Sequence, residues 1–287
     1  MKCAFVGLGV MGYPMAGFLR KAGHDVTVYN RTPGKAEAWC GEYGGRSATT
    51  PAGASEDADI VFCCVGNDDD VRDVILGSTG VLEGVRAGAI VVDHTTASAV
   101  VAREVYEAAE DKDVGFLDAP LSGGQAGAES GQLTIMVGGD EDIFDLARPV
   151  MDCYAKACTR IGPVGDGQRA KMVNQVCIAG IVQGLAEGLH LAKRGGLDIE
   201  AVIGAISKGA AQSWQMDNRW QTMVNDEFEF GFAVEWMRKD LGIALEEAER
   251  VGARLDMTRL VDGYYADVEA LGGRRYDTSS LIKRLEP

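Results

Sequence analysis

The spacing of apolar positions changes twice within the first thirty residues. Residues 2–6 form a short apolar run, and from Met11 to Leu19 apolar side chains recur with the spacing of one helical face. Gly23 then ends the helical pattern, and His24–Tyr29 alternates between polar and apolar residues as a strand does. This order predicts a strand, a helix and a second strand, at the length expected of a parallel βαβ unit.

The alternation of helices and strands continues to about residue 151. Asp59–Val65 and Gly88–Asp93 are apolar on both faces, which is typical of strands in the middle of a parallel sheet. Residues 161–167 are the clearest break, and from Gln168 the pattern is helical, beginning with a long apolar helix to about Arg194. We therefore predict an α/β protein with an N-terminal Rossmann-like doubly wound sheet (1–163) and an all-α domain with a long interdomain helix (164–287). Further helices are predicted at 33–43, 99–110 and 140–151, and further strands at 114–118 and 132–138.

The turn between the first strand and the first helix reads Gly7-Leu8-Gly9-Val10-Met11-Gly12. In such a GxGxxG turn the first glycine permits the turn, the second lets the backbone approach a pyrophosphate, and the third brings the helix close to the strand. The helix N-terminus then offers unpaired N–H groups to phosphate. A glycine-rich turn without a ligand is the alternative, but the position inside a complete βαβ unit favours a dinucleotide site at these six residues.

The residues after the second strand, Asn30-Arg31-Thr32, indicate which dinucleotide is preferred. A site that prefers NAD normally has Asp or Glu at this point, and a carboxylate would repel a 2′-phosphate. Arg31 can pair with that phosphate and stack on the adenine, while Asn30 and Thr32 can donate hydrogen bonds to its oxygens. We therefore predict NADP(H) as the cofactor. The alternative is that Arg31 is a solvated loop cation.

Two later strands end in polar turns, at the edge where doubly wound sheets bind ligands. Val65 closes one of them and Thr96 follows the other, which makes both candidate cofactor contacts, with Thr96 toward the nicotinamide. The acidic run 68–70 could suggest a metal, but carboxylates in the first turn of a helix normally stabilise the helix end. His94 has no charged partner nearby in the sequence, so we expect capping or surface packing rather than catalysis.

Charge and cysteine content narrow the classes of partner. The formal net charge of −15 and a pI near 4.7 argue against binding nucleic acid or an anionic membrane, so local donors must hold an anionic cofactor. The seven cysteines include no CxxC and suggest neither disulfides nor zinc, only buried thiols in a reducing cytoplasm. We expect no export signal and no metal, and residues 173–192 carry too many polar side chains for a membrane span, which predicts a buried helix in a cytoplasmic protein.

A second glycine-rich stretch runs from Asp118 to Gly131. Ser122, Gly123 and Gly124 follow a predicted strand, and exposed N–H groups together with the Ser122 hydroxyl could converge there on a carboxylate. A flexible hairpin connection before the strand at 132–138 explains the composition equally well.

Polar residues at the start of the long helix form another candidate cluster. Spacings of three and four place Lys171, Asn174 and Gln175 on one helix face. Near the positive end of the helix dipole a lysine holds its proton less tightly, which suits proton exchange, and the two amides could orient a hydroxyl or carbonyl. On spacing alone, a solvated lysine beside two polar neighbours is the more common arrangement.

Residues 228–241 combine aromatic and charged side chains. We expect an aromatic wall and an ion pair on one helical face, because the spacing suits a helix. Amphipathic packing would explain the aromatic residues but explains the charges of WMRKDL less well. The residues expected on this face are Phe232, Trp236, Lys239 and Asp240.

Four stretches in this order resemble one known family. They are GLGVMGYPMAGFLRKAGHDVTVYNRTPGK, DAPLSGGQAGAESGQLTIMVGG, GPVGDGQRAKMVNQ and FGFAVEWMRKDLGIALEEA. Together they resemble the β-hydroxyacid dehydrogenases, the group of 3-hydroxyisobutyrate dehydrogenases and glyoxylate or semialdehyde reductases, from residue 1 to about residue 282. The NRT sequence matches the members that use NADP.

The resemblance implies roles that the spacing alone leaves open. Lys171 would be the catalytic acid/base, and Ser122, Gly123 and Gly124 would hold the substrate carboxylate. Many members have a second asparagine at the position of Gln175, so this longer amide changes the pocket shape and leaves the substrate open. The other implied contacts are Asn174, Gln175, Phe232 and Asp240 at the substrate and Lys239 at the cofactor.

The implied activity is the NADP(H)-dependent interconversion of a small β-hydroxy acid, such as 3-hydroxyisobutyrate, and its semialdehyde, or the reduction of glyoxylate or succinic semialdehyde. The all-α domain would be 6-phosphogluconate dehydrogenase-like, although a pocket for 6-phosphogluconate itself is not expected in so short a chain. The alternatives are an imine reductase-like enzyme and a non-catalytic NADP-binding interaction module, and Lys171 argues against both. We also expect a homodimer or homotetramer through the second domain, because the long helix is too apolar for one small domain to cover.

Overall fold

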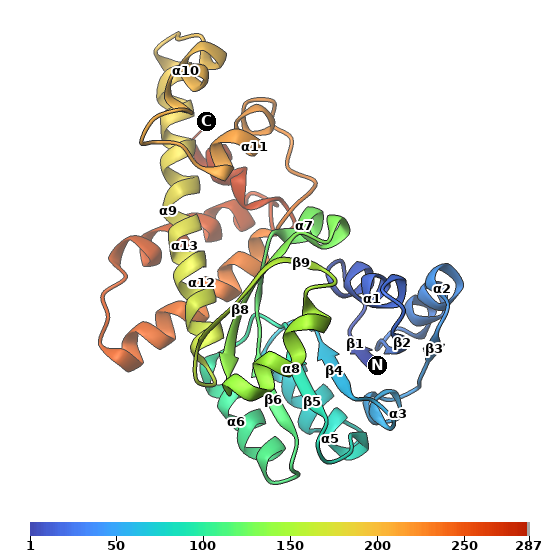
Figure 1. The fold of residues 1–287 in the computed structure, drawn as a ribbon. Helices are drawn as coiled ribbons and strands as arrows, with labels where there is room; N and C mark the ends of the chain where they lie inside the picture. Colours follow the sequence, from blue (N-terminus) through green and yellow to red (C-terminus); the bar gives the residue numbers. More distant parts are fainter. Residues whose placement is uncertain (286–287) are drawn as a thin grey trace. The chain divides into compact units, whose positions relative to one another are not determined.

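The computed structural model describes residues 1–285 and divides the chain into two compact units (Figure 1). The first unit runs from Met1 to Lys171, and the second begins at Met172. Helices and strands alternate in the first unit, and the second is helical. The predicted class, a doubly wound α/β part followed by an all-α part, is confirmed.

The first unit is built on a sheet whose parallel strands follow the order β3-β2-β1-β4-β5-β6. In this doubly wound order the two halves of the sheet run outward from the centre, and ligands bind at the carboxyl ends of the strands near the point of reversal. β1 lies at that point because it pairs with both β2 and β4. The strands are β1 (Lys2–Val6), β2 (Asp25–Tyr29), β3 (Arg46–Ser47), β4 (Ile60–Cys63), β5 (Ile90–Asp93) and β6 (Gly115–Asp118).

Three more strands extend this sheet beyond β6. β8 (Leu133–Gly139) is antiparallel to β6 and to the short β7 (Leu121–Ser122), and parallel to β9 (Ala155–Gly162). The sequence pattern predicted β8 but missed β9. The reason is that β9 lies at an edge with all of its residues exposed or half-buried, so its sequence has no apolar run.

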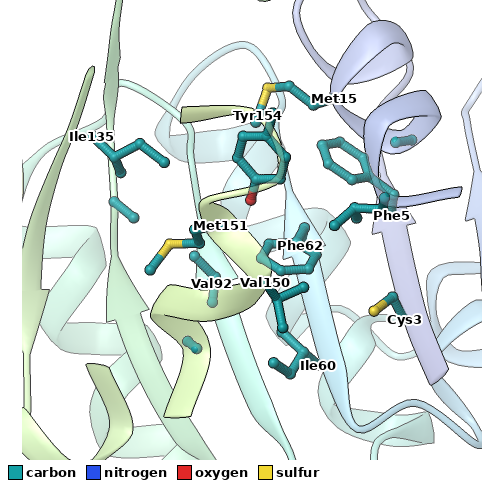
Figure 2. Packing of buried hydrophobic residues seen from close by; sticks show 14 of the residues in the cluster. Cys3, Phe5, Met15, Ile60, Phe62, Val92, Ile135, Val150, Met151 and Tyr154 are labelled. Carbon is teal, nitrogen blue, oxygen red and sulfur yellow. The ribbon is translucent and has the colours of Figure 1, made fainter. Parts of the chain in front are cut away.

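Alternate residues of the central strands face two separate cores. Phe5 and Phe62 belong to one core, which α1, α2 and α8 cover, and Figure 2 shows Tyr154 beside Phe62 in this core. Val6 and Val61 belong to the other core, which α3 to α6 cover. Burial on both faces is what the apolar runs predicted. The helices are α1 (Gly12–Lys21), α2 (Pro33–Tyr43), α3 (Pro51–Ser55), α4 (Asp68–Val71) with a π-helical turn (Arg72–Leu76), α5 (Val81–Gly84), α6 (Ala99–Glu110), α7 (Gly124–Ser130) and α8 (Glu141–Met151).

The glycine-rich stretch after β6 is more regular than its composition suggests. Instead of a flexible connection, it contains β7 and the helix α7, which ends at Gly131 with a left-handed backbone (φ +67). Gly123 and Gly124 between them also have positive φ values of +126 and +58. Glycine favours these conformations, so the two residues allow the chain to turn sharply from strand into helix.

The second unit packs its helices around a core of its own. α9 (Asp166–Arg194) begins in the first unit and continues into the second, where Ala186, Leu241 and Tyr265 from α9, α12 and α13 share this core. Buried Asp277 accepts hydrogen bonds from the backbone N–H groups of Phe232 and Ser279. The other elements are α10 (Ile199–Ile206), α11 (Trp214–Val224), α12 (Val234–Val251), α13 (Asp256–Ala270) and a 3-10 helix (Thr278–Leu285).

The long helix α9 is less buried than expected. Val173 is 65% exposed and Leu191 is 72% exposed, and Cys177 is an exposed thiol, so the expectation that all cysteines are buried is also wrong. All seven cysteines lie within the described residues and are free. α9 is long and apolar enough to span a membrane by length and composition alone, a test that core helices also pass, and 44% of its most apolar stretch is buried.

Candidate functional site

The glycine turn between β1 and α1 has the geometry that close packing and an approaching ligand require. Gly7 has φ +99, and a Cβ there would lie 2.2 Å from the Cys64 carbonyl oxygen; a Cβ on Gly12 would lie 2.0 Å from the Gly7 carbonyl oxygen. At Gly9 a Cβ would meet none of the described atoms within 4 Å. The outer glycines therefore allow strand and helix to pack, and the middle one leaves open space beside the backbone, as a dinucleotide pyrophosphate needs.

The N-terminus of α1 faces this same turn. Met11 occupies the N-cap and has no polar group to offer the first N–H groups, and no first-turn residue is acidic. Val10 is 66% exposed beside it, while Leu8 is buried. Backbone N–H groups at such a helix start suit a phosphate, so the turn fits the group that its sequence predicted.

The end of β2 is attached to the glycine turn. The Asn30 side chain accepts a hydrogen bond from the Leu8 N–H (2.9 Å) and donates one to the Thr32 carbonyl (3.1 Å). The Asn30 amide is thus engaged within the protein and shapes the turn. Thr32 is exposed, and Arg31 is exposed and forms an ion pair with Asp70 at the start of α4 (3.1 Å).

The turns after β4 and β5 are joined by hydrogen bonds. The Val65 N–H donates to the Thr95 hydroxyl (3.0 Å), and the Thr95 N–H donates to the Asp93 carboxylate (3.0 Å). Val65 and Thr96 are both half-buried at this carboxyl edge of the sheet. Burial raises the pKa of Asp93 to about 7.

His94 lies in the same turn but has a structural environment. Its Nδ1 donates to the Ala119 carbonyl (2.7 Å), because a carbonyl can only accept, and its Nε2 lies within hydrogen-bond distance of the Tyr154 hydroxyl (2.8 Å). Burial lowers the pKa of His94 to about 4. The expectation of capping or surface packing is wrong, because the ring is 2% exposed and packs in the core.

Buried polar groups anchor the start of α9 to the carboxyl ends of β5 and β6. The Asp118 carboxylate accepts from the N–H groups of Gly165 (2.7 Å) and Gln168 (2.8 Å). The Gln168 amide donates to the Thr95 carbonyl (2.7 Å) and accepts from the Ala97 N–H (3.0 Å). Burial raises the pKa of Asp118 to about 6, and the two N–H donors oppose this rise.

The anchored turn of α9 carries Lys171. This lysine lies three residues after Gln168 and is 7% exposed. Lysine is rarely this buried in a folded protein unless its ammonium group has a partner. The alternative reading of Lys171 as a solvated lysine on the helix surface is therefore wrong.

The predicted carboxylate loop also lies in the first unit. Ser122 pairs with Thr134 in the sheet and is half-buried, and Gly123 and Gly124 are exposed. The backbone therefore turns at the two glycines directly after Ser122, and the carboxylate site there stays a prediction.

The remaining predicted residues form a hydrogen-bonded group within the second unit. The Gln175 Nε2 donates to Asp240 Oδ2 (2.6 Å), and the Asn174 amide donates to Gln175 Oε1 (2.8 Å). Lys239 pairs with the other Asp240 oxygen (3.1 Å). These contacts bring the four side chains together, and their roles toward substrate and cofactor stay predictions.

Phe232 does not lie on the helical face that was predicted to hold it together with Trp236, Lys239 and Asp240. α12 begins at Val234, and Phe232 lies in the bend before it, next to Ala233, which forms an isolated bridge with Asp277. The predicted face of four residues is therefore wrong at this position, because the hydrogen bond from the Phe232 N–H to Asp277 holds the chain out of the helix.

Two residues of the site, Asp118 and Gln168, were not predicted from the sequence. Asp118 begins the DAPLSGG motif, which could have been a signal, but Gln168 has no sequence signature for its contacts more than seventy residues away. Within residues 1–285 no three His, Cys, Asp or Glu side chains are grouped to hold a metal ion.

Family models match both parts of the chain. Residues 2–162 match the NAD binding domain of 6-phosphogluconate dehydrogenase, and residues 165–285 match the family described as NAD-binding of NADP-dependent 3-hydroxyisobutyrate dehydrogenase.

Known relatives match nearly the whole length. An uncharacterized oxidoreductase of Shewanella frigidimarina is 61% identical over 99% of this chain and 98% of its own. The 2-hydroxy-3-oxopropionate reductase of Escherichia coli is 34% identical over 100% of this chain and 97% of its own. Among solved structures, a 3-hydroxyisobutyrate dehydrogenase of Mycobacterium tuberculosis with L-serine is 32% identical, with a TM-score of 0.91 over 100% of this chain and 99% of that one. The glycine turn, the doubly wound sheet and these matches lead to one conclusion: the chain belongs to the β-hydroxyacid dehydrogenase family and is an oxidoreductase that uses a nicotinamide cofactor.

Proposed function

We infer that this enzyme interconverts a small β-hydroxy acid, of the 3-hydroxyisobutyrate type, and its semialdehyde, or reduces glyoxylate or succinic semialdehyde, with NADP(H) and with Lys171 as the acid/base. The burial of Lys171 carries this proposal. It lies on the turn of α9 that Asp118 and Gln168 anchor to the carboxyl ends of β5 and β6, the edge where doubly wound sheets place their ligands.

The first unit supplies the groups that would hold the cofactor. The open backbone at Gly9 and the first turn of α1 suit its pyrophosphate, and exposed Arg31 and Thr32 suit a 2′-phosphate. Val65 and Thr96 at the ends of β4 and β5 are the proposed neighbours of the nicotinamide. When bound, the dinucleotide supplies hydride for reduction or accepts it in oxidation.

The proposed substrate residues work by orientation. The Ser122 hydroxyl and the backbone of Gly123 and Gly124 would hold the carboxylate without adding a net charge. Asn174 and Gln175 carry amides that suit a hydroxyl or carbonyl group, and Lys239 is the proposed second cation at the cofactor. Fixing the carboxylate decides which face of the neighbouring carbonyl is presented for reaction, and such positioning accounts for much of the rate enhancement in enzymes.

Lys171 exchanges one proton with the substrate in both directions of the proposed reaction. In reduction its ammonium group donates a proton to the carbonyl oxygen as that oxygen gains negative charge, leaving a neutral amine. In oxidation the neutral amine removes the hydroxyl proton and becomes ammonium again. The same side chain therefore supplies the proton in one direction and takes it back in the other.

The test is a Lys171→Met variant, which keeps the aliphatic stem and removes the titrating group. NADPH oxidation is followed with glyoxylate, succinic semialdehyde, methylmalonate semialdehyde and tartronate semialdehyde, and NADP⁺ reduction with the matching alcohols. We expect kcat to fall about 10²- to 10⁴-fold with the best substrate, while the Kd for NADPH changes less than about threefold.

Lys193→Met is the matched control, because Lys193 is an exposed lysine near the other end of the same helix. This variant should retain the wild-type kcat. If Lys171→Met retained turnover, or if the wild type bound the cofactor but reduced none of the four acids, the proposed acid/base and substrate class would be wrong.

A further inference from the structure

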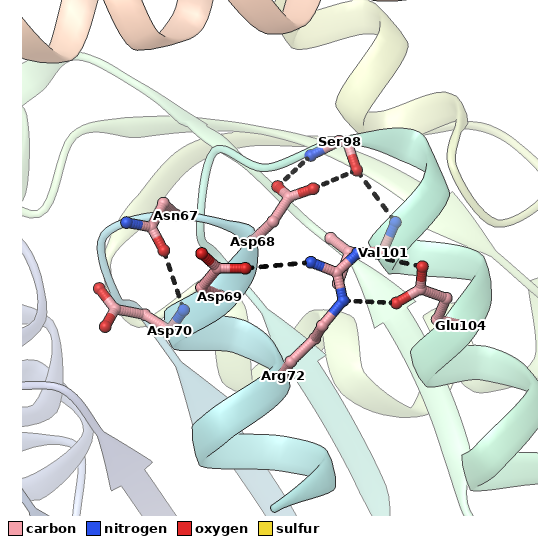
Figure 3. A network of polar contacts seen from close by, with 8 residues as sticks. All are labelled: Asn67, Asp68, Asp69, Asp70, Arg72, Ser98, Val101 and Glu104. Carbon is pink, nitrogen blue, oxygen red and sulfur yellow. Dashed lines mark hydrogen bonds and ion pairs between the residues drawn. The ribbon is translucent and has the colours of Figure 1, made fainter.

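Three consecutive carboxylates begin α4, and each has a different partner. Asp68 accepts hydrogen bonds from the N–H and hydroxyl of Ser98, and Asp69 pairs with Arg72 (3.3 Å). Asp70 instead pairs with Arg31 at the end of β2 (3.1 Å). In Figure 3 the Asp68 and Asp69 carboxylates face Ser98 and Arg72, while the Asp70 carboxylate points away from both. Of these three acids, Asp70 is therefore the one that contacts Arg31, the residue proposed to bind the 2′-phosphate.

Asp70 is held more firmly than its partner. Asn67 caps the helix by accepting a hydrogen bond from the Asp70 N–H (2.9 Å), and Arg72 ties the next turn to Glu104 on α6 with two hydrogen bonds (2.7 and 3.0 Å). The Asp70 side chain is 28% exposed, whereas that of Arg31 is 82% exposed. The carboxylate is thus a fixed feature of the first unit, and the long arginine side chain is the member of the pair that is free to exchange partners.

We propose that Asp70 is a specificity-determining residue that competes with the cofactor 2′-phosphate for Arg31 and so moderates the preference for NADPH over NADH. The inference rests on the proposed role of Arg31. A guanidinium group pairs with a carboxylate or a phosphate through the same planar set of N–H donors. Binding of NADPH must therefore displace or share the Arg31–Asp70 pair, and NADH, which has no 2′-phosphate, leaves that pair intact.

The position of Asp70 gives this competition a further consequence. A site that prefers NAD places an acidic residue at the end of β2, where this chain has Asn30-Arg31-Thr32. Here the carboxylate comes from α4, thirty-nine residues later, and reaches the same arginine. Cofactor choice in this chain is then set by two opposed charges on separate elements, and not by the NRT sequence alone.

The experiment measures the Kd of NADPH and of NADH by calorimetry, together with that of the adenosine fragment 2′,5′-ADP, so that turnover is not needed. Asp70→Asn should tighten NADPH and 2′,5′-ADP about 2- to 5-fold, the range expected for releasing an exposed ion pair, and leave NADH within about twofold. Asp69→Asn is the matched control, since Asp69 carries the same charge on the same helical turn but pairs with Arg72 instead of Arg31. It should leave the ratio of the two Kd values unchanged.

The Arg31→Ala background separates competition from simple repulsion. If Asp70 acts by holding Arg31, adding Asp70→Asn to Arg31→Ala should leave the ratio of Kd values where Arg31→Ala put it. An unchanged ratio in Asp70→Asn, an equal shift in Asp69→Asn, or a shift that persists without Arg31 would each overturn the inference while leaving the dehydrogenase assignment intact. A wild type that binds neither dinucleotide would overturn the proposed function and this inference with it.

Discussion

Each unit buries one carboxylate among the proposed site residues, but the two are held in different ways. Asp118 in the first unit accepts hydrogen bonds from two backbone N–H groups, those of Gly165 and Gln168. Asp240 in the second unit is held by side chains, the Gln175 amide and the Lys239 ammonium. The first arrangement depends on the path of the chain, whereas the second depends on which residues stand at three positions.

The path of the chain around Asp118 leaves no room for side chains. A Cβ on Gly167 would lie 2.4 Å from the Asp118 carbonyl oxygen and 2.7 Å from the Gly138 nitrogen, and a Cβ on Gly138 would lie 2.4 Å from the Asp118 carboxylate. Closely packed backbone cannot yield as a flexible side chain does. The start of α9 is therefore fixed by backbone contacts that only glycine allows.

The largest effect is expected from Gly167→Ala. The new methyl group would overlap backbone atoms of Asp118, Gly138 and Met136, so we expect the free energy of unfolding to fall by about 3 kcal/mol or more. Gly184→Ala is the matched control, because its Cβ would meet none of the described atoms within 4 Å in the same helix. Alanine there should be neutral or stabilise by up to about 1 kcal/mol. Thermal unfolding followed by circular dichroism gives both values, and a Gly167→Ala variant as stable as Gly184→Ala would refute the backbone account.

The next effect concerns the pH dependence that the buried Asp118 imposes on stability. Its pKa is raised from 3.8 to about 6, so the folded state favours the protonated form. The stabilisation is fully present below pH 3.8 and is lost as the pH rises through 6; the shift corresponds to about 3 kcal/mol. The raised pKa of neighbouring Asp93 acts in the same direction.

Asp118→Asn removes this titration. Between pH 4 and pH 7 the wild type should therefore lose stability relative to the variant, by up to about 3 kcal/mol. Chemical denaturation of both proteins across that range measures the difference. Parallel stability curves would mean that Asp118 has an ordinary pKa in the folded protein.

Most helices and strands of the first unit could be predicted from the sequence because their signals are local. The spacing around Gly7–Gly12 predicted the turn, and the helix predicted at 99–110 matches α6 at both ends. Each of these signals lies within about a dozen residues. Parallel strands buried on both faces add their own mark, a continuous apolar run.

The features that were not predicted are contacts between residues far apart in the sequence, and elements whose composition is untypical of a strand or helix. Asp118 and Gln168 are fifty residues apart, and Arg31 and Asp70 are thirty-nine apart, so no periodic pattern connects them. β9 is an edge strand without an apolar run, and the glycines of α7 resemble a loop. Phe232 has helical spacing to Trp236, yet its hydrogen bond to Asp277 keeps it outside α12.

The smallest effect is expected at the side-chain arrangement of the second unit. Gln175→Asn shortens the amide by one methylene, which weakens or lengthens the hydrogen bond to Asp240 but keeps an amide at that helix position. We expect a loss of about 1 kcal/mol in the free energy of unfolding, because a buried carboxylate loses part of one hydrogen bond while the Lys239 pair remains. The ratio of kcat/KM for succinic semialdehyde to that for glyoxylate should rise, since the shorter amide makes room for the longer acid, while the Kd for NADPH stays within twofold. Equal changes for both acids would show that Gln175 supports Asp240 without shaping the substrate pocket.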